Sequence, residues 1–93
     1  MSMTMNDAQL LQEYAKNRSE AAFAELIERY VGLVYSSCWR QLRDRHLAED
    51  ATQAVFVLVS QKAAAGSLRA PTLAAWLLST ARYTCASVRR TDW

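Results

Sequence analysis

The spacing of apolar residues between positions 19 and 42 constrains the fold more than any other feature. These residues recur at steps of three and four: Phe23, Leu26, Ile27, Tyr30, Val31, Val34, Tyr35, Cys38 and Leu42. Because an α-helix turns once in about 3.6 residues, this spacing predicts one long helix with a single buried face. Ser19 can cap its N-terminus. Gly32 interrupts the run and suggests close packing against another helix.

The rest of the chain predicts further helices. Asp7 is a suitable N-cap for the first of them, while Gly66 ends a helix and Pro71 opens the next. Only two glycines and one proline occur, which are too few turn-forming residues for a many-stranded sheet. The expected ranges are 7–17, 46–64 and 71–90. We therefore predict an all-α fold, a compact four-helix bundle forming one domain over 7–90, with flanking tails at 1–6 and 91–93.

The sequence shows neither a membrane span nor a secretory signal. No apolar run approaches the roughly 18 residues that a membrane span needs, and the N-terminus lacks a basic patch followed by a hydrophobic segment. We therefore expect a cytoplasmic protein with no membrane partner.

The last helix ends near Arg90 with no Gly or Asn cap. That ending suggests a domain cut from a longer protein.

Cysteine and histidine residues give no sign of a metal or catalytic site. Cys38 and Cys85 are far apart in the sequence, and with His46 they are too few for a zinc site. We expect two reduced, largely buried thiols. His46 has no evident nucleophile or metal partner, and Gly66 stands alone rather than in a phosphate-binding loop. The prediction is no cofactor, no metal and no enzymatic activity.

Charge is distributed unevenly along the chain. Residues 1–50 carry six Lys and Arg against eight Asp and Glu, whereas residues 51–93 carry five against one. Such a chain can present opposite signs to two partners.

The helix expected over 46–64 has a narrow polar edge. Its inner side is predicted to carry Leu47, Ala51, Val55, Leu58 and Lys62, extended by Ala48, Thr52, Phe56 and Val59. The remaining strip comprises Glu49, Asp50, Gln53, Val57, Ser60 and Gln61. Asp50 and Gln53 project together because they lie three residues apart. The strip is either an ordinary solvated edge or a docking surface for a basic partner, and the residue pattern leaves both open.

Basic and aromatic residues gather in the loop after Lys62 and on the last helix. Arg82 and Arg89 share one face, and Tyr83 and Arg90 share the adjacent one. Cations for phosphates beside surfaces where bases can lodge are typical of single-stranded DNA binders. Alternatively, the final arginines offset the dipole at the C-terminus of the helix. Trp76 is interpreted as a core residue.

Three phrases, in this order, resemble region 2 of the extracytoplasmic-function sigma factors of the sigma-70 family. "EAAFAELIERY" (20–30), within the stretch 7–35, is similar to the opening helices of that family. "LAEDATQAVFVLVSQKA" (47–63) is similar to its polymerase-binding helix, and "WLLSTARYTCASVRR" (76–90) to its −10 promoter helix. The likeness covers nearly the whole chain.

This resemblance implies partners and site residues. It places a contact with the clamp helices of the largest subunit of core RNA polymerase at Glu49, Asp50, Gln53 and Val57. It places contacts with the non-template strand of the melted −10 element at Lys62, Ser67, Arg69, Arg82, Tyr83, Arg89 and Arg90. It also implies regulation by an anti-sigma factor.

The chain departs from the family pattern at a few positions. Ala54 stands where the family often has a glutamate, Tyr83 replaces a common asparagine, and Ser87 lies near a usual aspartate. These departures bear on promoter preference. Two rival functions stay open: a double-stranded-DNA-binding regulator of helix-turn-helix type, and a helical interaction or dimerisation domain without polymerase function.

Overall fold

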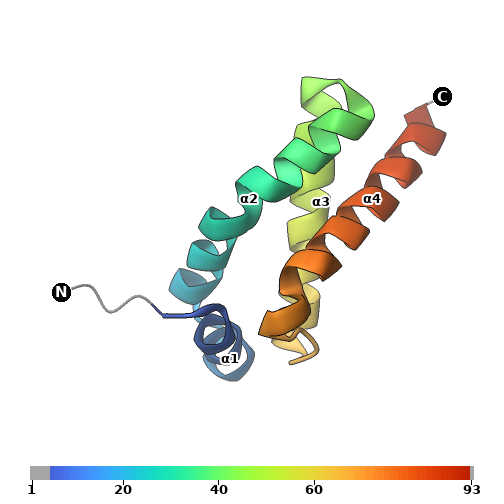
Figure 1. Cartoon of the computed structure of the whole chain (residues 1–93). Helices are drawn as coiled ribbons and strands as arrows, with labels where there is room; N and C mark the ends of the chain where they lie inside the picture. The colour runs from blue at the N-terminus through green and yellow to red at the C-terminus, as the bar shows by residue number, and fades with distance from the viewer. Residues whose placement is uncertain (1–4, 93) are drawn as a thin grey trace.

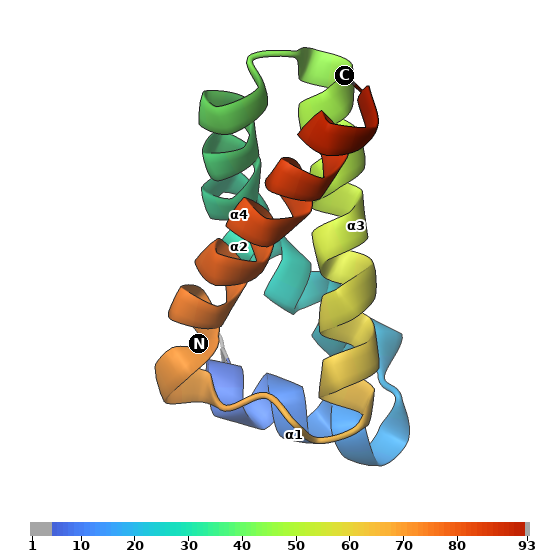
Figure 2. The same ribbon diagram turned by 90° about the vertical axis from the view of Figure 1, so that its right-hand side faces the viewer.

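The computed structural model describes residues 5–92, with side chains described through Arg90. Its elements are four α-helices and one 3-10 turn: α1 (Asp7–Asn17), α2 (Glu20–Leu42), α3 (Arg45–Ala64), η1 (Ala70–Thr72) and α4 (Leu73–Asp92). Figure 1 shows α2 and α4 running in the same direction and α3 running against both. Figure 2 shows α1 lying across the end of the bundle where α3 stops and α4 begins. The described residues contain no strand, so the predicted all-α four-helix fold is confirmed.

Side-chain caps set the helix starts. Asn6, not Asp7, caps α1: its Oδ1 accepts from the Gln9 amide at 2.8 Å, and Gln9 Oε1 accepts from the Asn6 amide at 2.9 Å. The prediction of Asp7 as the cap was wrong, because its carboxylate instead accepts hydrogen bonds from α2. Ser19 caps α2 as predicted, accepting from the Ala22 amide at 3.2 Å. Asp44 caps α3 and moves its start to Arg45.

In the loop between α3 and α4, Gly66 and Pro71 lie where the sequence predicted that one helix ends and the next begins. Gly66 adopts φ 72°, a left-handed conformation that favours glycine, and its amide donates to the Ala63 carbonyl at 3.0 Å. Pro71 lies in η1, which leads directly into α4. The chain therefore turns back along the bundle immediately after α3 ends.

The core lies where α2, α3 and α4 meet. Its side chains are at most 3% exposed and include Leu26, Val34, Cys38, Ala51, Val55, Val59, Leu73, Leu77, Ala81 and Cys85. α2 and α3 each pack against the other three helices, whereas α1 and α4 do not pack against one another. Trp76 is half-buried against this core, as predicted. Leu58, expected inside, is 37% exposed because its position falls at the edge of the buried face of α3.

Gly32 does not mediate close helix packing. A Cβ atom at this position would meet nothing within 4 Å, and the residue is exposed. The helix register explains this: Val34 points into the core, and two residues correspond to a rotation of about 200°. The prediction of a close contact was therefore wrong.

We expect Gly32→Ala to raise the free energy of unfolding by about 1 kcal/mol. Alanine restricts the unfolded chain and favours helix, and the added methyl group meets open space. Urea unfolding followed by circular dichroism measures the change. Gly66→Ala is the matched control, and it should destabilise the domain because of its positive φ. A Gly32→Ala variant no more stable than the parent would contradict this account.

Cys38 and Cys85 are both free thiols and fully buried, as predicted. Their proximity was not predicted: the two thiols lie near enough to one another, between α2 and α4, for Cys38 to influence the ionisation of Cys85. Burial, followed by the neighbouring Cys38 thiol, raises the pKa of the Cys85 thiol to about 12.

This raised pKa gives the domain a specific dependence on alkaline pH. The unfolded thiol ionises near pH 9.0, whereas the folded one stays protonated to about pH 12. Between these two values only the unfolded thiol loses its proton, which favours unfolding. The free energy of unfolding is therefore unaffected by this group below pH 9.0 and falls as the pH rises toward 12, by up to about 1.4 kcal/mol per pH unit. Urea unfolding between pH 8 and about 10.5 should show a shallower decline for Cys85→Ala. Equal slopes for the two proteins would refute it.

Candidate functional site

The polar edge of α3 faces solvent. Glu49, Asp50, Gln53 and Val57, hereafter the α3 strip, are all exposed, and Val57 retains 51% of its accessible surface. Glu49 lies 3.6 Å from Arg45 Nε in an exposed ion pair, which contributes little stability. Asp50 and Gln53 make no side-chain hydrogen bond or ion pair within residues 5–90. Their polar atoms are therefore available to a partner.

The α3 strip borders a groove of about 670 Å³ between α2 and α3. Ile27, Val31 and Tyr35 form the α2 wall, and Thr52 and Phe56 lie on the α3 side together with Glu49, Asp50 and Gln53. The groove thus combines an apolar floor with an acidic and amide rim. Sequence reasoning missed the α2 wall because it assigned those residues to the buried face. The available signal was the four-residue step that places Val31 and Tyr35 on one edge of α2.

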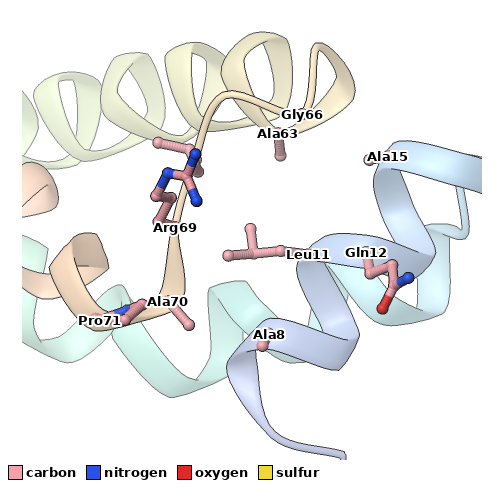
Figure 3. A pocket seen from close by; sticks show the side chains of 10 residues that line it. Ala8, Leu11, Gln12, Ala15, Ala63, Gly66, Arg69, Ala70 and Pro71 are labelled. Carbon is pink, nitrogen blue, oxygen red and sulfur yellow. The ribbon is translucent and has the colours of Figure 1, made fainter.

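The loop after α3 forms a second concave surface, of about 450 Å³, against α1. In Figure 3, Arg69 and Leu11 project into the space between the loop and α1. Small residues line much of the rest, including Ala8, Ala15, Ala63, Gly66 and Ala70. Lys62 and Ser67 are exposed beside this pocket and do not line it. Sequence reasoning missed the contribution of α1.

The basic residues of α4 are exposed as a set. Arg82, Tyr83, Arg89 and Arg90 all face solvent, and Tyr83 is 72% exposed. Residues 73–90 of α4 contain no acidic side chain. Arg82 lines a third groove, between α4 and α2. It therefore does not share a groove with Asp50 and Gln53, which lie on α3 and line the groove between α2 and α3.

Within residues 5–92 no group of three or more His, Cys, Asp and Glu side chains could hold a metal ion. No helix in that range is long and apolar enough to cross a bilayer.

Comparison with protein families gives one match, and it identifies the family of the chain. A sequence model of sigma-70 region 2 matches residues 26–93. The chain belongs to the sigma-70 region 2 family. Region 2 domains are non-enzymatic parts of transcription initiation factors that bind core RNA polymerase and recognise the −10 promoter element. Searches of curated proteins and of solved structures gave no match.

The match to region 2 covers most of α2, all of α3, the loop and α4. Both grooves beside α2 are therefore built from residues of the family domain. α1 lies outside the match, yet it packs on α2 and α3 and supplies one wall of the loop pocket.

Proposed function

We propose that this region 2 domain belongs to an extracytoplasmic-function sigma factor that docks on RNA polymerase and holds melted promoter DNA. The observation that carries the proposal is the separation of two surfaces. The α2–α3 groove has a rim containing Glu49 and Asp50, whereas the charged side chains of residues 73–90 in α4 are all arginines. Two partners of opposite charge can therefore bind at once without competing for the same groove.

The α3 strip and its groove suit a partner that is both basic and apolar. Asp50 and Gln53 offer an unpaired carboxylate and amide, while Val31, Tyr35 and Phe56 supply apolar contacts beside them. A charged rim around an apolar centre is the common arrangement in protein interfaces. We propose that this partner is the pair of clamp helices of the largest polymerase subunit, as the family resemblance implies.

Replacing Asp50 and Gln53 together by alanine should weaken binding to core RNA polymerase at least about tenfold. Loss of charge-assisted hydrogen bonds accounts for a change of that size. Both residues are exposed, so the circular dichroism spectrum should not change. A pull-down or interferometry titration with core polymerase measures the affinity.

Glu20→Ala is the control, because it removes an exposed carboxylate at the start of α2, away from the groove. Unchanged polymerase affinity in the Asp50/Gln53 variant would favour an interaction domain without polymerase function.

The loop pocket and α4 suit unpaired DNA. Arg69, Arg82, Arg89 and Arg90 provide cations for phosphates, and Tyr83 exposes an aromatic ring on which a base can stack. The pocket between α1 and the loop is lined largely by small residues that allow close approach of a flipped base. We propose that melting of the −10 element is stabilised by capture of a non-template base there.

Filling this pocket tests base capture. Ala8 is exposed and lines the pocket, so Ala8→Trp should block entry without disturbing the core. We expect about tenfold weaker binding of a forked −10 oligonucleotide to the polymerase complex, since a captured base contributes roughly 1–3 kcal/mol. Polymerase affinity should be unchanged.

Ala21→Trp is the matched control, an exposed alanine of α2 that does not line the pocket. Fluorescence anisotropy measures both variants. If the unaltered domain binds duplex more tightly than forked DNA, the double-stranded-DNA regulator is favoured instead.

We further propose that the domain extends over 7–90, that it acts in the cytoplasm with the polymerase, and that an anti-sigma factor covers one or both surfaces. Packing of α1 on α2 and α3 supports including residues before the family match. An anti-sigma factor that covers the α3 strip would compete with core polymerase, whereas one that covers α4 would compete with promoter DNA.

A further inference from the structure

The groove between α2 and α4 is a basic surface to which both helices contribute an arginine. It encloses about 340 Å³ and is lined by Ser37, Arg40 and Gln41 of α2 and by Leu78 and Arg82 of α4. Of its two arginines, the family resemblance assigns a DNA contact only to Arg82, and no sequence pattern predicts a role for Arg40. The structure brings these two arginines, 42 positions apart in the chain, to the same groove.

Neither arginine is neutralised by the protein. Both are exposed, no carboxylate lines the groove, and neither forms an ion pair or side-chain hydrogen bond within residues 5–90. Two cations facing one groove repel each other unless an anion lies between them. The helix dipole explains Arg40, in the last turn of α2, but not Arg82, which lies in the middle of α4.

The remaining groove residues hold its shape. Gln41 Nε2 donates to both the carbonyl and the hydroxyl oxygen of Ser37 at 3.2 Å, and Ser37 is only 8% exposed. Leu78, half-buried, forms an apolar wall on the α4 side. An apolar wall lowers the local dielectric and strengthens the attraction between guanidinium groups and an anion.

We propose that Arg40 and Arg82 bind one backbone phosphate, or two neighbouring ones, of the promoter DNA, so that the strand passes from α4 onto α2. The inference rests on the proposed function and extends it to a helix that carries no assigned DNA contact. Guanidinium groups bind phosphate oxygens in paired hydrogen bonds, which suits two arginines that converge from different helices. Arg89, seven residues after Arg82 on the same face of α4, continues the basic path.

Neutral phosphates at single positions test this contact. The complex of this protein with core RNA polymerase is titrated with a fluorescent forked −10 oligonucleotide and with copies carrying one methylphosphonate each. Arg40→Ala and Arg82→Ala should each weaken binding of the ordinary DNA about tenfold, as expected for loss of a charge-assisted hydrogen bond. Both effects should vanish on the DNA that is neutral at the shared phosphate or its neighbour.

Lys16→Ala is the control, because it removes an exposed cation from α1, outside the groove. Arg40→Lys should recover part of the affinity, since it keeps the charge without the planar fork. The inference is overturned if Arg40→Ala behaves like Lys16→Ala, or if no methylphosphonate removes its effect. It is also overturned if Arg40 and Arg82 respond to phosphates that are not adjacent.

The same titration separates this inference from the function on which it rests. If the unaltered complex binds the forked DNA no better than core polymerase alone, the proposed function fails, and the phosphate site fails with it. If the complex binds DNA normally but Arg40→Ala does not change the affinity, the proposed function stands and only the phosphate site is rejected.

Discussion

The packing of α2 against α3 and α4 is the constraint on which the other features depend. Val34 and Cys38 of α2 are wholly buried in the same core cluster as Val55 of α3 and Ala81 and Cys85 of α4. Once these side chains fix the rotation of α2, its two flanks become walls of separate grooves, one acidic at its rim and one basic. A rotation of α2 that exposed Val34 would remove both surfaces together, because they share this helix.

α1 depends on a second, smaller set of contacts. Leu10 and Leu11 bury its inner side, and Asp7 accepts hydrogen bonds from Arg29, at 2.8 Å, and from Tyr30 of α2. The hydrogen bond to Asp7, followed by partial burial, raises the pKa of Tyr30. Arg29 also pairs with Glu25 at 2.8 Å, so a small network holds the start of α1 on α2. The position of the loop-pocket wall therefore depends on polar contacts as well as on the core.

The sequence predicted the helices well because apolar spacing and capping residues act locally. It predicted the surfaces less completely. Periodicity indicates which side of a helix is buried but not how much of that side a neighbour covers, so Val31 was assigned to the core and is 38% exposed. The convergence of Arg40 with Arg82, and of α1 with the loop, joins residues distant in the chain, for which no local pattern exists. The exposure of the α3 strip was readable because its residues are neighbours on one helix.

The paired thiols have a chemical consequence. Thiolate, not thiol, is the species that oxidants and electrophiles attack. With a pKa of about 12, Cys85 carries roughly one thiolate in 10⁵ molecules at neutral pH, and neither sulfur reaches solvent. Because both cysteines are fully buried, we expect peroxide to reach them only after α2 and α4 separate.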